Sequence, residues 1–212
     1  MTTSAQSGRS TDGGVVHKLP DAPARRWAKT DATQQRILDA ATEVFGAKGF
    51  TAATIADVVA GSGASIGSIY HHFGGKKELY LAIFERMADD IGRRIDQAAE
   101  TTGELDGPRA FETQVRAYLD AMWLNRRAAI VLASGDAPAG FDRIRRNSML
   151  SSFRRWISVL DLDAASPRDQ LLTRILVAIM AESALMVTVC DDAADAEPII
   201  DATIEWIYRL TG

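Results

Sequence analysis

Residues 54–73 constrain the fold most strongly, because they hold two short apolar segments separated by a glycine-rich turn. The first segment places three apolar residues on one helical face behind Thr54, a residue type that caps helix N-termini. The turn reads GSG at residues 61–63, where glycine can adopt positive φ. The second segment follows Ser65, another capping residue type, and runs to about residue 72. Two short helices on so tight a turn predict a helix-turn-helix.

The second helix of this unit combines small residues with hydrogen-bond donors. Small residues in the turn and at the start of the helix let its backbone approach a large partner, and hydroxyl and imidazole groups on the outward face offer donors. A DNA major groove and its phosphates fit that description. The residues expected to contact DNA are Thr54, Ser65, Ile66, Gly67, Ser68, Tyr70 and His71.

Helical periodicity continues on both sides of this unit, which predicts an all-α protein. A first helix is expected from Asp31 to about Gly49, and a long helix with an apolar stripe over residues 79–98. Prolines are expected in the first turns of the last two helices. Later helices are expected at 108–125, 126–134, 141–160, 167–190 and 198–210.

Three regions are expected from this pattern. Residues 1–29 should form a disordered basic arm and residues 30–78 a three-helix DNA-binding domain. The long helix should join this domain to a helical ligand-binding and dimerisation domain, residues 79–212.

The charge is unevenly distributed along the chain, whose formal net charge is −4. Residues 1–80 hold nine Lys and Arg against seven Asp and Glu, whereas the remainder holds fifteen against twenty-one. An anionic partner is therefore expected at the N-terminal part. Arg25 and Arg26 precede the first helix, where a flexible arm could enter a DNA minor groove. A disordered leader without DNA contacts is the alternative.

Residues 33–50 and the segment TIADVVAGSGASIGSIYHHFGGKKELYLAIFE resemble the N-terminal DNA-binding domain of the tetracycline-repressor (TetR) family of bacterial regulators. The resemblance covers roughly a quarter of the chain. The matching positions are Ala60, Gly61, Ser65, Gly67, Tyr70, His72, Phe73, Lys76, Glu78 and Leu79.

The resemblance implies that residues 65–72 form the recognition helix and that Tyr70 and Lys76 bind DNA phosphates. A phenol and an ammonium beside a helix N-terminus suit an anion site. Ala53 stands where the family often has Thr, and Ile66 where a polar or basic residue is frequent. Fewer hydrogen-bonding groups are therefore expected to face DNA, and the sequence does not define the operator.

The segment LLTRILVAIMAESALMVTVC, which follows Pro167, is apolar on nearly every side and must be covered all round. One monomer offers few neighbours, so part of this helix and of the amphipathic last helix is expected to face a second copy. Burial within the monomer is the alternative. The resemblance implies the same homodimer, with a double-stranded DNA operator as its partner.

The resemblance also implies a small-molecule effector site between the long helix and the helices after it. Methionines and aromatic residues adapt to apolar ligands, and a few polar groups orient them. Each candidate could instead be a core residue. The candidates are Met122, Trp123, Arg126, Met149, Phe153, Trp156, Met180, Glu182 and Met186.

The sequence contains no phosphate-binding glycine loop, metal-ligand cluster or Ser/His/Asp set, so neither an enzyme nor a cofactor is expected. His71 and His72 point about 100° apart on a helix and lack a third ligand nearby. With one cysteine and no long apolar run, a cytoplasmic protein without a membrane partner is expected.

We therefore expect a regulator, most simply a repressor that a small apolar or amphipathic effector releases from DNA. The alternative is an interaction module that keeps the fold without ligand-controlled DNA binding.

Overall fold

The computed structural model describes residues 22–102, 107–148, 160, 162–163 and 165–211, including their side chains except at 22–31, 102 and 108. No strand occurs among these residues, and the all-α class is confirmed. Residues 141–148 form a helical stretch between α6 and α8. The other helices are α1 (Ala22–Ala52), α2 (Ile55–Ser62), α3 (Ile66–Phe73), α4 (Lys76–Thr102), α5 (Gly107–Leu124), α6 (Arg126–Ala133), α8 (Pro167–Thr188) and α9 (Ala193–Thr211).

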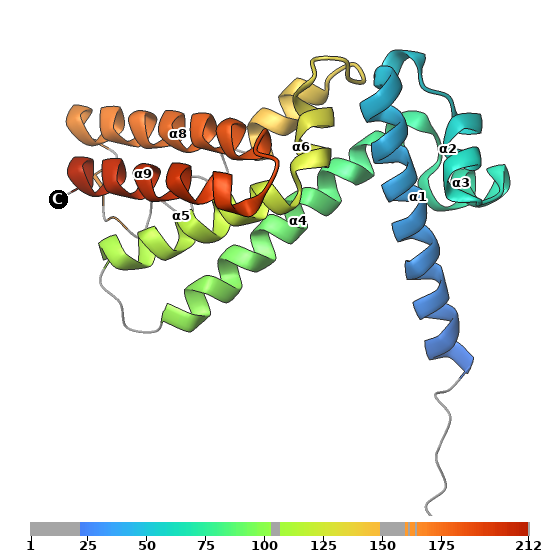
Figure 1. Ribbon diagram of the computed structural model, residues 1–212, viewed down its shortest axis with the longest axis horizontal. Coiled ribbons are helices and arrows are strands. Elements are labelled where there is room, and N and C mark those ends of the chain that lie inside the picture. The colour runs from blue at the N-terminus through green and yellow to red at the C-terminus, as the bar shows by residue number, and fades with distance from the viewer. Residues whose placement is uncertain (1–21, 103–106, 149–159, 161, 164, 212) are drawn as a thin grey trace, which may run out of the picture.

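The helices form a small head and a larger body (Figure 1). The head consists of α1, α2 and α3, and α4 leads from it along the body, where α5, α8 and α9 pack together. With 27 residues, α4 is about 40 Å long. The α6 helix lies between the two parts and contacts both α1 and α4.

Local capping defines both short helices of the head. Thr54 and Asp57 form a capping box at the start of α2, and Gly63 ends the helix in the left-handed conformation at φ 65°. Ser65 then accepts a hydrogen bond from the backbone N–H of Ser68 at the start of α3. The expected caps and the expected glycine turn are confirmed.

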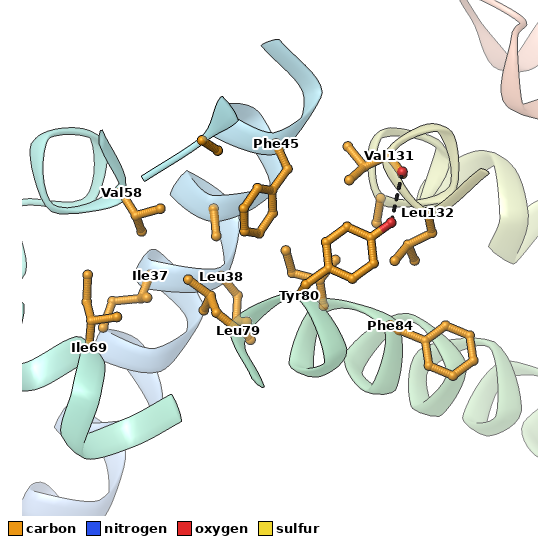
Figure 2. Close-up of a cluster of buried hydrophobic side chains, with 14 of the residues drawn as sticks. Ile37, Leu38, Phe45, Val58, Ile69, Leu79, Tyr80, Phe84, Val131 and Leu132 are labelled. Carbon is orange, nitrogen blue, oxygen red and sulfur yellow. Dashed lines mark hydrogen bonds between the residues drawn. The ribbon is translucent and has the colours of Figure 1, made fainter. Parts of the chain in front are cut away.

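The head shares one hydrophobic core with α6 (Figure 2). Ile37 of α1, Ile69 of α3 and Leu79 of α4 are fully buried in it. Tyr80 extends this core towards α6, where its hydroxyl donates to the backbone carbonyl of Val131 at 3.2 Å. A displacement of α6 therefore acts directly on packing inside the head.

A second hydrophobic core holds the body together, with residues from α4, α5, α8 and α9. Between α8 and α9 the buried Thr203 hydroxyl donates to Ser183 Oγ at 2.7 Å. On the surface, Arg116 of α5 pairs with Glu197 and Asp201 of α9, both at 2.6 Å. These contacts fix α9 against the rest of the body.

Two expected helix starts are wrong. The first helix begins at Ala22, so residues 22–29 are helical and not a disordered arm. Alanine, arginine and lysine are strong helix formers, and Pro23 suits the first turn. The last helix begins at Ala193, which leaves Pro198 inside it. Asp192 accepts from the backbone N–H of Asp195 at 3.0 Å and so provides the earlier start.

The boundary expected between residues 78 and 79 stays a prediction. An uninterrupted α4 crosses it, and the first turns of α4 belong to the core of the head.

The α8 helix is long and apolar enough to cross a membrane by length and composition, with a mean hydropathy of 1.8 over 18 residues. The core helix of a water-soluble protein meets the same criterion. One face of α8 is buried against α5 and α9, including Leu176 and Met180. The other face exposes apolar side chains, among them Leu171 and Met186.

Candidate nucleic-acid interface and ligand cavity

The outward face of α3 is the candidate DNA-contacting surface. Ile66 and Tyr70, one helical turn apart, expose 56% and 51% of their surface, and His71 is also exposed. Ile69, on the adjoining face of the same helix, is fully buried and anchors α3 to the head. The helix thus presents an apolar, a phenolic and an imidazole group to a partner.

The start of α3 is open to close approach. A side chain built at Gly67 would meet only Ser65 Oγ, at 4.0 Å. Ser65 uses its oxygen as the helix cap, which leaves its O–H free to donate outward. Ser68 is half-buried on the same turn. The expected cluster at Ser65, Ile66, Gly67 and Tyr70 is therefore present on one surface.

The start of α2 differs from the expectation, because Thr54 is already engaged. Its hydroxyl donates to Asp57 Oδ2 at 2.8 Å and accepts from the backbone N–H of Asp57 at 3.2 Å. Lys48 pairs with the same carboxylate at 2.6 Å. Hydrogen bonds from Lys48 and Thr54 lower the pKa of Asp57 to about 2. A permanent carboxylate at this terminus disfavours a DNA phosphate, so the geometry does not support Thr54 as a DNA contact.

Lys76 also has a different role in the structure from the one expected. Its ammonium donates to the backbone carbonyls of Phe50, Thr51 and Ala53 at 2.8, 3.1 and 2.9 Å, and lies 4.7 Å from the Phe50 ring centroid. An ammonium has three N–H donors, and all three are used here. Lys76 therefore caps the end of α1 and is not free to bind a phosphate in this arrangement.

Residues 49–53, which run from the kink of α1 at Gly49 to the start of α2 and which we call the α1–α2 connection, are held from the body as well. The N–H of Thr51 donates to both carboxylate oxygens of Asp136 at 3.2 and 3.0 Å, and the Thr51 hydroxyl donates to Asp136 Oδ1. Asp136 lies after α6, and Figure 1 shows this segment beside the end of α1. Sequence reasoning missed this contact, which joins residues far apart in the chain.

Arg25 and Arg26 lie in the first turns of α1, and their side chains are outside the described part. These turns project beyond α2 and α3 (Figure 1). A role in DNA binding stays a prediction for both residues.

Comparison with known proteins places the head in a family. A family model described as bacterial regulatory proteins, tetR family, matches residues 37–83. A solved structure of a TetR-family bacterial regulatory protein from Rhodococcus RHA1 matches with a TM-score of 0.64 and 25% identity, over 85% of this chain and 97% of that one. The head therefore has the DNA-binding domain of the TetR family, and the chain as a whole has the fold of a TetR-family regulator. This family consists of transcriptional regulators and not of enzymes, in agreement with the expectation from sequence.

Two curated TetR-family relatives match less than half of the chain. The HTH-type transcriptional regulator SrpR of Pseudomonas putida is 36% identical over 95 residues, which cover 45% of this chain and 42% of SrpR. The HTH-type transcriptional activator FasR of Mycolicibacterium smegmatis is 34% identical over 90 residues, which cover 42% of this chain and 40% of FasR. The match thus spans about two fifths of these relatives' length.

The body contains a cavity of about 230 Å³ between α4, α5, α6, the 141–148 stretch and α8. The lining is mainly apolar, and Arg145 is its one charged residue among those described. The guanidinium of Arg145 also lies 3.5 Å from the carboxylate oxygen Oδ1 of Asp142. The lining includes Phe84, Met87, Ile91, Gly92, Tyr118, Met122, Ala129, Leu132, Ala133, Arg145, Ser148, Ala184, Leu185 and Thr188.

Of the expected ligand-binding residues, Met122 lines this cavity. Trp123 and Arg126 stack on each other outside it, with the guanidinium carbon 4.3 Å from the ring centroid. Met149, Phe153 and Trp156 lie outside the described residues.

The remaining three candidates, all on α8, do not line the cavity. Met180 is buried in the core of the body, whereas Glu182 and Met186 are exposed. The cavity instead meets Ala181 and Leu185, one position away from Glu182 and Met186 and therefore rotated by about 100°. Phe84, Met87 and Ile91 line the cavity but were not among the expected ligand-binding residues; the apolar stripe of α4, to which all three belong, is the sequence pattern that could have indicated them.

Proposed function

We propose that this protein is a homodimeric, sequence-specific DNA-binding regulator of transcription. The observation that carries the proposal is the exposed outer face of α3 on a capped helix-turn-helix. Ile66 suits contact with a thymine methyl, and Ser65 and His71 each offer a single hydrogen bond to a base edge. Tyr70 is the proposed phosphate contact.

Base reading by α3 is limited in this proposal, because residues 65–72 contain no Arg, Lys, Asn or Gln. Those side chains make most two-pronged contacts to guanine and adenine. The basic first turns of α1, with Arg25 and Arg26, would add contacts to flanking DNA, where narrow A·T-rich minor grooves attract arginine.

We propose that α8 and α9 form the dimer interface. Both helices expose large apolar side chains, including Leu171 at 59% on α8 and Trp206 at 57% on α9, and Val189, which directly follows α8, is 72% exposed. A second copy would cover these side chains, and the resulting two-fold symmetry would require a near-palindromic operator. This interface also accounts for the apolar character of α8 without a membrane, in line with a cytoplasmic location.

The cavity is the proposed effector site. Its apolar lining with a single arginine suits a small apolar or amphipathic molecule. Phe84 joins the cavity wall to the core of the head, so a ligand that displaced α4 would alter the spacing of the two recognition helices. Such coupling between sites is typically worth about 1–3 kcal/mol.

Repression follows most simply from this scheme, since a bound dimer blocks polymerase by occupancy. One relative, FasR, is named an activator, so the sign of regulation depends on where the operator lies.

The test starts from DNA that the purified protein selects from a random duplex library. The complex of the protein with the selected duplex is then titrated with the amphipathic dye 8-anilinonaphthalene-1-sulfonate. The dye should weaken the binding of the protein to DNA. A dye that fills the cavity with equal affinity in the presence and absence of DNA would contradict effector control. In that case the protein would bind DNA without control by a ligand. Selection of no sequence at all would contradict specific DNA binding itself.

A further inference from the structure

The α1–α2 connection lies between a cation from the head and an anion from the body. Gly49 leaves the helical path there with φ 76°, and the next residues turn towards α2. Lys76 occupies the carbonyls of this connection, and Asp136 occupies the N–H and hydroxyl of Thr51. Because α2 starts at Ile55, the geometry of the connection sets where the helix-turn-helix points relative to α1.

The contact with Asp136 is close and specific. A Cβ built at Gly49 would come within 2.3 Å of Asp136 Oδ2, so only glycine permits this approach. Both oxygens of the carboxylate accept hydrogen bonds from the single residue Thr51. Those hydrogen bonds lower the pKa of Asp136, so the carboxylate stays ionised at neutral pH.

Asp136 is also near the ligand cavity along the chain. Leu132 and Ala133, four and three residues before it, line the cavity, and so does Arg145 after it. The Tyr80 hydroxyl of α4 additionally donates to the carbonyl of Val131, which lies in α6 with Leu132 and Ala133. The segment that carries Asp136 is therefore anchored in the cavity wall at both ends.

From these contacts we propose that Asp136 is a positioning residue for DNA binding, which fixes the α1–α2 connection through Thr51 and ties it to the cavity wall. The inference rests on the proposed function and adds a second link between body and head besides α4. Asp136 itself touches no DNA in this scheme. It acts by holding Thr51, and hence the start of α2, in the geometry that presents α3.

The direction in which DNA affinity changes on removal of the Asp136 charge separates a positioning role from simple charge repulsion between Asp136 and DNA. Removal of a carboxylate near a DNA-binding surface should strengthen DNA binding, because DNA is a polyanion. If Asp136 positions the helix-turn-helix, Asp136→Asn should instead weaken specific binding by about tenfold, the value of one charge-assisted hydrogen bond.

The experiment uses the full chain and a duplex that the wild-type protein selected from a random library. We would measure the dissociation constants for this duplex and for a scrambled duplex, together with Tm, for Asp136→Asn, Thr51→Ala and the double variant. Asp89→Asn is the matched control, since it removes the same charge from an exposed position on α4. Specific affinity should fall in both single variants, no further in the double variant, and not in the control.

Non-specific affinity should stay close to wild type in Asp136→Asn. A loss of specific and non-specific affinity in parallel with Tm would assign Asp136 a merely structural role and overturn the inference. Unchanged or tighter specific binding by Asp136→Asn would overturn the inference as well. The proposed function would remain intact in that case, as long as the wild-type protein binds the selected duplex specifically. If Asp136→Asn does not fold, Thr51→Ala alone decides. Because this variant is the weaker perturbation, its affinity for the selected duplex should fall by about threefold, and an unchanged affinity would contradict the inference.

Discussion

Lys76→Ala separates two roles that the same lysine could have in a helix-turn-helix protein. In the structure the Lys76 ammonium makes three hydrogen bonds of 2.8 to 3.1 Å to the end of α1 and lies over the Phe50 ring. After its removal the carbonyls, which are only partly buried, could bond to water. We therefore count the three contacts as one charge-assisted hydrogen bond, about 2 kcal/mol. For a chain of this size that loss lowers Tm by about 4–8 °C.

The assay is thermal unfolding of Lys76→Ala, combined with the salt dependence of its DNA affinity. Lys77→Ala is the control, because it removes the same charge from the next, exposed position. We expect a lower Tm for Lys76→Ala only, and an unchanged salt slope. An unchanged Tm with a salt slope smaller by about one would refute this reasoning and restore Lys76 as a phosphate ligand.

Three further predictions follow from the cavity, the α9 surface and the α2 cap. Gly92→Leu should fill the cavity, since a side chain built at Gly92 meets nothing within 4 Å. Fluorescence titration should show that the variant no longer binds the anilinonaphthalene dye, while its affinity for the selected duplex is unchanged. Retained dye binding would contradict the proposed effector site. Trp206→Glu should raise the dimer dissociation constant by at least about thirtyfold in sedimentation, as expected for a buried interface tryptophan, and an unchanged constant would exclude Trp206 from the interface. The folded-state pKa of Asp57 is about 2, below its ordinary value of 3.8, so its stabilising effect is present above pH 3.8 and is lost as the pH falls towards 2. The Tm difference between wild type and Asp57→Asn should shrink over that range, and a difference that grows on acidification would reverse the assignment.

The local features of the head could be predicted from sequence because they depend on neighbouring residues. A cap at Thr54, a positive φ at Gly63 and a cap at Ser65 are each set within three or four positions, and all occur as expected. The alternation of buried Ile69 with exposed Ile66 and Tyr70 follows from helical periodicity alone.

The role of Lys76 could not be predicted in the same way. A motif position says where a residue lies along the chain, but a lysine side chain is long enough to reach either DNA or the end of α1. The choice depends on the carbonyls of Phe50 and Ala53, which become available only when α1 and α4 pack together.

The cavity and the contact of Asp136 with Thr51 depend on distant parts of the chain. Asp136 and Thr51 are 85 positions apart, and no periodicity links them. On α8 the sequence predicted Glu182 and Met186, whereas Leu185 lines the cavity, because an apolar helix gives no indication of which face is hollow.

Footprinting of the selected duplex tests the central claim most directly, because it reports specificity and symmetry together. The account predicts two protected half-sites arranged as an inverted repeat, bound by two copies of the chain, with centres separated by whole helical turns of DNA. Protection of a single unpaired half-site, or uniform protection without a preferred sequence, would contradict a symmetric dimer that reads DNA through α3.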